Sequence, residues 1–364
     1  MRKFNYSILN NIQMDNKLIK YISKIYEAKG KQELYLKQKP FELDRLIEIA
    51  KIQSTESSNA IEGIKTTTKR IADLINNKTT PKNRDEQEIA GYRDALNIIH
   101  ERFEYIPITT NYILQLHKIL YSHNLSKDIG GKLKQAQNYI EATDNDGNKT
   151  IIFKPIEPAF THEALDNLCA EFNRAISAGE SEPLLLIFSF IHDFLCIHPF
   201  SDGNGRMSRL LTTLLLYRSG FLVSRYISLE AIISKNKDLY YESLHSAGIG
   251  WDENKEDITT FIKYMLNIVY TAYVEFEDRV DMVRVKLTAE EQVLKALDKK
   301  IGKTTKSEIL ELCPNISASS VEKQISRLVE NGKLTKVSKG RSSFYIINEW
   351  FSVSYIVIEN CINR

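Results

Sequence analysis

Apolar side chains recur every three to four residues along most of the chain, which is the spacing of amphipathic helices. In residues 41–52, for example, Leu43, Leu46, Ile47 and Ala50 fall on one helical face. Residues 182–197 are so apolar that we expect this helix to be buried on most sides. The pattern therefore predicts a mainly α fold, with further helices over residues 69–76, 85–103, 112–121, 163–178, 206–219, 239–247 and 257–274.

One segment departs from the helical pattern. Residues 136–140 and 150–154 are rich in β-prone side chains and flank a polar stretch in which Gly147 follows Asp146. A glycine after an aspartate between two such runs is typical of a turn. We therefore predict a β-hairpin in this region.

The last part of the chain combines short helices with strands. Helices are predicted over residues 289–299, 305–312 and 317–331, and strands over residues 334–338 and 343–347. Ser317 or Ser319 begins the third of these helices as its N-cap, and Asn331 with Gly332 ends it. This layout resembles the winged helix-turn-helix family.

Length and composition agree with several folding units. The chain has 364 residues, of which 43% are hydrophobic and 26% charged, with only 15 Gly and 8 Pro. This balance excludes a disordered or fibrous chain, and the scarcity of turn residues favours long helices. We predict an N-terminal helical region (1–84), a core (85–275) and a winged-helix domain (285–350).

Charge and apolar content restrict the partners. The chain carries 49 Lys and Arg against 47 Asp and Glu, so its net charge of +2 excludes polyanion binding over the whole surface. The start has no apolar leader, and residues 184–200 are interrupted by His192, Asp193 and His198, so we expect a cytoplasmic protein with no membrane partner. Four widely spaced cysteines disfavour a disulfide scaffold.

An anion-binding loop is predicted where residues 203–205, Gly-Asn-Gly, precede the helix over 206–219. Backbone N–H groups at a helix N-terminus attract anions, and glycine lets them approach a ligand closely. Arg206 and Arg209 are three residues apart, so they share a helical face and can bind phosphate oxygens in pairs. The loop is therefore predicted to bind phosphates.

Two further side chains give this loop a chemical function. Asp202 stands among groups suited to anions, where it fits as a ligand of Mg²⁺, which proteins bind through one or two carboxylates plus phosphates. His198 follows the apolar helix, precedes Pro199 and is a candidate general base. These residues predict a nucleotide polyphosphate, a metal and a base. Residue types alone leave a plain turn and a structural histidine open as the alternative.

Residues 198–209, HPFSDGNGRMSR, match the Fic family motif HPFx(D/E)GNGRxxR at every fixed position, and the chain resembles this family over roughly residues 85–275. The resemblance implies a protein adenylyltransferase, which moves AMP from ATP to a Ser, Thr or Tyr hydroxyl of a protein and releases pyrophosphate. The roles it implies are proton removal by His198, Mg²⁺ binding by Asp202, a phosphate cradle of Gly203, Asn204 and Gly205, and contacts to the β- and γ-phosphates by Arg206 and Arg209. Gly205 disfavours the family branch that acts as a kinase and carries lysine there.

The resemblance extends to two flanking segments. The hairpin over residues 135–154 occupies the position of the family's flap, which holds the target by adding a strand to an exposed edge, so Asn138, Tyr139 and Ile140 are predicted to bind the target. Tyr240 and Tyr241 match the family's YYxxL element near the adenine.

A built-in inhibitor is implied by residues 58–63, SNAIEG, which resemble the family's inhibitory pattern (S/T)xxxE(G/N) within a helix over about residues 54–63. Ser58 and Glu62 are four residues apart, so on a helix they face the same way. The resemblance implies that Glu62 bonds Arg209 and excludes the γ-phosphate. A capping glutamate is the alternative, and the sequence also leaves open whether Glu62 positions water for removal of AMP.

The partners of the C-terminal segment stay open. Residues 285–348 hold 12 Lys and Arg against 7 Asp and Glu. Such a basic segment could place residues 317–330 in a DNA major groove and residues 339–341 on phosphate. The alternative for this segment is dimerisation or docking of the target. The alternative for the whole protein is a transcription-linked binding protein whose Fic site serves regulation. The target protein and a homodimer are not determined by the sequence.

Overall fold

The computed structural model describes residues 2–38, 40–76, 78–124, 128–143, 149–179, 181–284, 288–298, 303–313, 316–339 and 342–348. The chain divides into two compact units: Met1–Gln38 with Ala50–Phe276, and Lys39–Ile49 with Glu277–Arg364. Apart from residues 39–49, the predicted N-terminal region thus lies in the same unit as the predicted core. Over the described ranges, none of the helices has the length and apolar content that crossing a bilayer demands.

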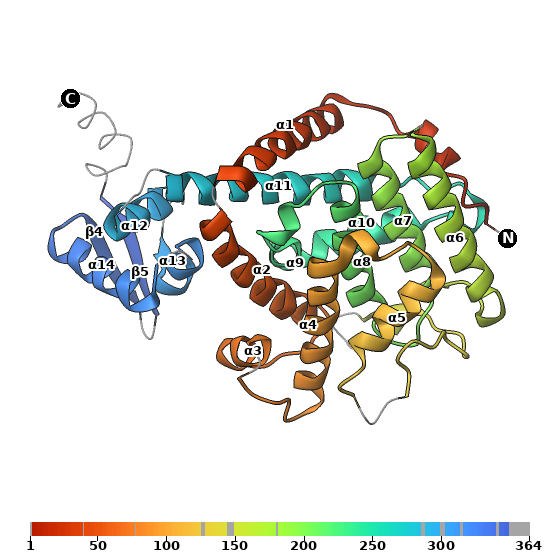
Figure 1. The fold of residues 1–364 in the computed structure, drawn as a ribbon, viewed down its shortest axis with the longest axis horizontal. Helices are drawn as coiled ribbons and strands as arrows, with labels where there is room; N and C mark the ends of the chain where they lie inside the picture. The colour runs from red at the N-terminus through yellow and green to blue at the C-terminus, as the bar shows by residue number, and fades with distance from the viewer. Residues whose placement is uncertain are drawn as a thin grey trace. The chain divides into compact units, whose positions relative to one another are not determined.

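The larger unit is almost wholly helical (Figure 1). Its first elements are η1 (Ser7–Asn11), α1 (Asn16–Gln38), the part of α2 (Pro40–Ile61) from Ala50 onward, α3 (Thr68–Ile75), α4 (Arg84–Arg102), η2 (Phe103–Tyr105) and α5 (Thr110–Leu120). Helix α2 continues beyond the predicted end at residue 52, because no helix-breaking residue occurs before Gly63, which takes the left-handed φ of +81°. Ser58 therefore lies within the same helix as the predicted segment 41–52, and Glu62 lies at its C-terminal end.

Three consecutive helices form the centre of this unit: α6 (Pro158–Ala178), α7 (Pro183–Ile197) and α8 (Asn204–Arg218). Helix α7 packs against α6 on one side and α8 on the other, while α4 packs against α5 and α8. All of α7 except Pro183 and Leu195 is buried, which confirms the prediction for residues 182–197. Further elements are η3 (Val223–Arg225), α9 (Leu229–Lys235), α10 (Lys237–Gly248), η4 (Trp251–Glu253) and α11 (Thr259–Arg284).

The predicted hairpin forms between α5 and α6. Strand β1 (Ile140–Thr143) pairs antiparallel with β2 (Lys149–Phe153). The predicted strand over 136–140 was wrong by four residues at its start, because Gln137 and Asn138 place their side chains on backbone carbonyls instead of lying in a ladder. The predicted turn at residues 146–147 lies outside the described residues.

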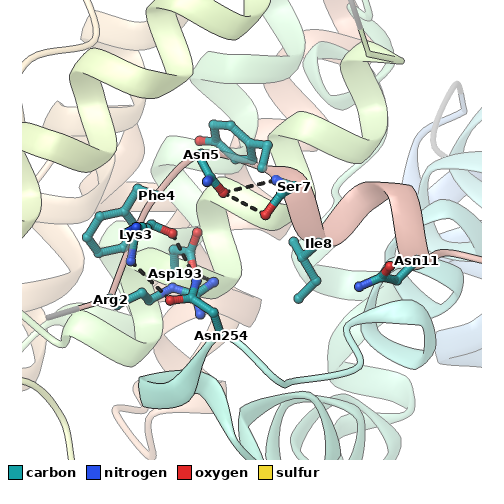
Figure 2. Close-up of a pocket in the computed structure, with 10 residues that line it drawn as sticks. Arg2, Lys3, Phe4, Asn5, Ser7, Ile8, Asn11, Asp193 and Asn254 are labelled. Atoms are coloured by element: carbon teal, nitrogen blue, oxygen red, sulfur yellow. Dashed lines mark hydrogen bonds and ion pairs between the residues drawn. The ribbon is translucent and has the colours of Figure 1, made fainter.

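The N-terminal segment places one arginine in the interior (Figure 2). Arg2 is only 8% exposed and pairs with Asp193 of α7 at 2.8 Å and with Glu256, which precedes α11. Its guanidinium also lies 4.7 Å from the ring of Trp251, whose Nε1 donates to Asp193 at 2.6 Å. Each of these buried charges therefore lies against a charge of opposite sign, which offsets the cost of removing it from water.

The smaller unit contains α12 (Ala289–Asp298), β3 (Thr304–Thr305), α13 (Lys306–Leu312), α14 (Ala318–Glu330), β4 (Leu334–Lys339) and β5 (Ser342–Ile347). Its described strands form an antiparallel sheet in the order β3-β5-β4. The helices and long strands agree with the predicted ranges, and Ser317 is the N-cap of α14. The prediction missed β3, which is too short to show a periodic pattern. The smaller unit has a hydrophobic core of its own, whose buried residues include Val293, Leu297, Ile309, Val321, Ile325 and Leu328.

Candidate active site

The loop between α7 and α8 brings the predicted catalytic residues together. His198 is the C-cap of α7 with a left-handed φ of +50°, and Gly203 is the N-cap of α8 with φ +84°. A side chain at Gly203 would also meet the hydroxyl of Tyr121 at 2.9 Å. These two turns reverse the chain within six residues, so that His198 and Asp202 lie beside the first turn of α8.

His198 is held as a neutral base. Its Nδ1 lies 3.2 Å from the carbonyl oxygen of Leu195. A carbonyl can only accept, so we assign the ring proton to Nδ1, which leaves Nε2 as the acceptor. Burial lowers the pKa of His198 to about 4, and the nearby Lys134 ammonium acts in the same direction. The ring is therefore unprotonated at neutral pH, as a general base must be.

A carboxylate lies on the N-terminus of α8. A methyl group added at Gly205 would stand 2.2 Å from Oε1 of Glu62, so this carboxylate directly covers the first turn of the helix. Arg209, one turn further, donates through Nη2 to the same oxygen at 2.8 Å. It also donates through Nε to the hydroxyl of Ser58 at 2.8 Å. Ser58 and Glu62 thus act on one guanidinium from one helix, and Glu62 occupies the position that a helix N-terminus offers to an anion.

Arg206 is buried and paired with groups of neighbouring helices. Its side chain is 1% exposed and pairs with Glu88 of α4 at 2.8 Å. It also donates to the hydroxyl of Tyr121 at 2.8 Å and lies 3.8 Å from Asp202. Its predicted contact with the β-phosphate stays a prediction. In the structure Arg206 joins α8 to α4 and α5, and sequence reasoning missed Glu88 because its partner lies far away in the chain.

Asn204 closes the loop on itself. Its side chain accepts from the backbone N–H of Phe200 at 2.9 Å and donates to the carbonyl of the same residue at 2.7 Å. Phe200 is fully buried, in agreement with a loop packed into the core. The asparagine therefore shapes the cradle in this structure, and its predicted part in positioning phosphates stays a prediction.

Asp202 is suited to a hydrated cation. Its carboxylate is 38% exposed at the mouth of the loop, with Arg84 at 3.8 Å. Within the described ranges, no group of three or more His, Cys, Asp or Glu could hold a metal ion. A cation at Asp202 would therefore take its other ligands from phosphates and water, which is the way Mg²⁺ is bound. The residues present fit that ion.

His117 is a positioning residue that the sequence did not single out. Its ring stacks on Phe200 at 3.7 Å between centroids. Nδ1 accepts from the N–H of Gly131 at 2.9 Å, so Nε2 carries the proton and donates to the backbone carbonyl of Asp202 at 3.0 Å. Burial lowers the pKa of His117 to about 4, which preserves this tautomer. The available signal was a histidine within the apolar stripe of residues 112–121.

The flap residues separate in the structure. Ile140 begins β1, whereas Asn138 and Tyr139 precede it, and Tyr139 is 46% exposed. Asn138 donates to the carbonyls of His198 and Phe200 at 3.2 and 3.0 Å. Its side chain is thus engaged by the catalytic loop in this structure, and the predicted target contacts of the flap stay predictions.

Tyr240 and Tyr241 lie on α10 next to Arg209. Tyr240 is buried and its ring meets that of Tyr241 edge-on at 5.4 Å, while Tyr241 is 42% exposed. Burial raises the pKa of Tyr240, and the Arg209 charge opposes this shift. Lys237 of the same helix donates to the carbonyl of Ile61 at 3.1 Å, so α10 also holds the end of α2. Sequence reasoning missed Lys237.

Comparison with known proteins assigns the region around this loop to a family. Residues 107–216 match the model of the Fic/DOC family. The match runs from the start of α5 to near the end of α8, so it contains the loop and the hairpin. Ser58, Glu62, Tyr240 and Tyr241 lie outside it.

Known Fic proteins resemble this chain in sequence and fold. Protein adenylyltransferase fic-1 of Caenorhabditis briggsae is 26% identical over 185 residues, which cover 50% of this chain and 32% of that protein. The chain thus spans about a third of the length of such curated relatives. A Fic family protein from Desulfovibrio desulfuricans G20 has a TM-score of 0.61 at 19% identity, over 93% of this chain and 97% of that one. A Fic domain containing signaling protein from Bacteroides thetaiotaomicron has a TM-score of 0.60 at 22% identity. The chain therefore shares the mainly helical Fic fold.

Proposed function

We propose that this protein transfers AMP from ATP to a hydroxyl group of a target protein and of itself, and that Glu62 restrains the reaction. The observation that carries the proposal is a neutral His198, six residues before Asn204 at the start of α8 and near enough to Glu62, which covers that helix N-terminus, for the Glu62 charge to act on the His198 pKa. The names of the curated relatives, which include protein adenylyltransferases, support the same reaction.

The reaction assigns one task to each group. The acceptor oxygen attacks the α-phosphorus of ATP, the bond from this phosphorus to the bridging oxygen breaks, and pyrophosphate leaves. The proton of the hydroxyl passes to Nε2 of His198, which its low pKa keeps available. The N–H groups of residues 204–206 and the guanidinium of Arg209 attract the phosphates. Mg²⁺ held by Asp202 would neutralise phosphate charge.

Restraint follows from the competition for one place. The Glu62 carboxylate and a terminal phosphate are both anions, and both suit Arg209 and the N–H groups over Gly205. The Glu62 carboxylate and a phosphate cannot both lie between Gly205 and Arg209, because their negative charges repel and their atoms would overlap. Glu62 is 32% exposed and belongs to the end of α2, so its side chain can leave without unfolding the core.

The first test compares label transfer from ATP labelled at the α- or the γ-phosphate. Glu62→Gly is expected to raise transfer of the α-label by about ten- to a hundred-fold, because the freed Arg209 gains charge-assisted bonds of about 1.5–3 kcal/mol to phosphate. His198→Ala in that background should lower transfer about a thousand-fold. Glu62→Gln keeps the size without the charge and should give an intermediate rate.

Transfer of the γ-label in place of the α-label would contradict the reaction, and equal rates in wild type and Glu62→Gly would contradict the restraint. The reverse direction is tested on the modified protein itself. If Glu62 positions water for removal of AMP, wild type releases AMP from the modified Glu62→Gly protein, and Glu62→Gly does not.

A further inference from the structure

The loop that carries His198 is held by two residues of the segment before β1, through both side chains and one backbone N–H. Together they bind four consecutive backbone carbonyls, those of residues 197–200. Lys134 donates through Nζ to the first at 3.0 Å and through its backbone N–H to the third at 2.9 Å. Asn138 donates through Nδ2 to the second at 3.2 Å and to the fourth at 3.0 Å. Lys134 and Asn138 are called the loop clamp below.

The two members of the loop clamp are also joined to each other. Nζ of Lys134 donates to Oδ1 of Asn138 at 2.9 Å. Lys134 is 4% exposed, so its ammonium group hydrogen-bonds to these protein oxygens instead of to solvent. An ammonium is costly to bury unless hydrogen bonds compensate it, and this one is compensated by the loop. The clamp therefore acts as one unit.

The loop needs such a clamp for two physical reasons. The last carbonyls of α7 have no partners within the helix, and a cation at a helix C-terminus is favoured by the helix dipole. His198 has a left-handed φ of +50°, which is unfavourable for a residue other than glycine. Strained backbone of this kind persists only where the surroundings hold it. The clamp hydrogen-bonds to the carbonyls of residues 197, 199 and 200, which lie on both sides of His198.

We propose that Lys134 and Asn138 are positioning residues, which hold the catalytic loop so that Nε2 of His198 meets the acceptor hydroxyl. This inference rests on the proposed function. Asn138 stands two residues before β1, so the clamp also ties the base to the strand on which the target segment is expected to pair. The hydrogen bonds of the clamp end on residues 197–200, whereas the groups proposed to bind the nucleotide, Asp202 and Arg209, come later in the chain. Loss of the clamp should therefore impair proton transfer and not ATP binding.

The kinetic test uses the Glu62→Gly protein and its self-modification. Lys134→Met and Asn138→Ala are each expected to lower kcat by about a hundred-fold, which is the cost of misplacing a catalytic group by about an ångström. KM for ATP should stay within about two-fold, because the clamp contributes no ground-state nucleotide contact. Lys134→Arg keeps the charge and the donors and should recover part of kcat.

Lys132→Met is the matched control. Lys132 is two residues from Lys134, is exposed and pairs with Asp128, so its loss should leave kcat unchanged. The double variant Lys134→Met with Asn138→Ala should be little slower than the slower single variant, because both remove the same clamp. An unchanged kcat in both single variants, or a rise of KM for ATP with kcat intact, would overturn the inference.

A second readout does not require any transfer activity. The ring-nitrogen NMR shifts of His198 report which nitrogen carries the proton. We expect the Nδ1–H form in the parent protein and a mixture of both forms in Asn138→Ala, because a loosened loop no longer keeps the His198 ring against the carbonyl of Leu195 in α7. An unchanged tautomer in Asn138→Ala and Lys134→Met contradicts the clamp, whether or not the parent transfers label. If the Glu62→Gly protein, with the clamp intact, transfers no label, that result contradicts the proposed function and not the clamp.

Discussion

Two glycines of the catalytic loop are needed for different reasons. Gly203 has a left-handed φ of +84° and lies directly against Tyr121. A residue with a side chain would be strained at this φ and would also collide with Tyr121. Gly205 has ordinary helical geometry, and its importance is the open space above it, which Glu62 fills in this structure. The sequence signalled both residues as part of a phosphate cradle. It could not show that one serves the backbone and the other serves the ligand.

The space over Gly205 can be tested directly. In the Glu62→Gly protein we expect Gly205→Ala to weaken ATP binding by about ten-fold, or about 1.4 kcal/mol, because a methyl group then takes the place of phosphate. Stability should hardly change, since alanine is the better helix former. Titration calorimetry measures the affinity. Gly30→Ala, at a helical glycine of α1 with no atom near the added methyl, is the control and should bind ATP as its parent does. Equal affinity in the Gly205→Ala protein would show that the phosphates bind elsewhere.

The elements follow their sequence patterns where packing and local preference agree. Helix α7 is mostly apolar and is buried as expected, while α2 is longer than its predicted apolar stretch because Gly63 is the first residue that breaks it. The first strand of the hairpin was misplaced for the opposite reason. In this segment Asn138 bonds two carbonyls of the catalytic loop and Gln137 bonds the carbonyl of Pro155, which are hydrogen bonds that a strand would not offer.

The N-terminal segment is joined to α7 by a buried ion pair, and this connection should contribute strongly to stability. Arg2→Met is expected to lower the free energy of unfolding by about 3 kcal/mol, because Asp193 and Glu256 then remain buried without their cation. Urea unfolding followed by circular dichroism measures the loss. Lys3→Met changes an exposed neighbour and should have little effect. If both variants unfold alike, the segment does not hold its place in solution.

At the scale of the whole molecule, the larger unit carries several histidines as buried neutral rings. Burial lowers the pKa of His100 and His192 to about 3 and that of His117 and His198 to about 4. In the unfolded chain each would titrate near its ordinary value, about 6.5. Below that pH the unfolded chain binds more protons than the folded one, so stability is full above about pH 6.5 and falls as the pH drops toward 4.

The expected loss is large enough to measure. The four rings together cost about 5 kcal/mol between pH 7 and pH 5.5. Burial raises the pKa of Asp193 to about 6, which offsets about 1 kcal/mol, so the free energy of unfolding should fall by about 4 kcal/mol. Urea titrations at the two pH values give this difference. His192→Phe removes one titrating ring and should reduce the difference by about a third. A free energy that is the same at both pH values would mean that these rings are charged or solvated in the folded protein.

The sequence by itself determined the mainly helical fold, the layout of the smaller unit and the residue types of the catalytic loop, because these depend on spacing along a short stretch of chain. Only the tertiary structure decided which partners the charged groups take. Glu62 reaches Arg209 across 147 positions, Glu88 takes Arg206, and Lys134 with Asn138 holds the loop of His198. Such pairs arise where packing brings distant helices within a few ångströms, and no local pattern records that distance.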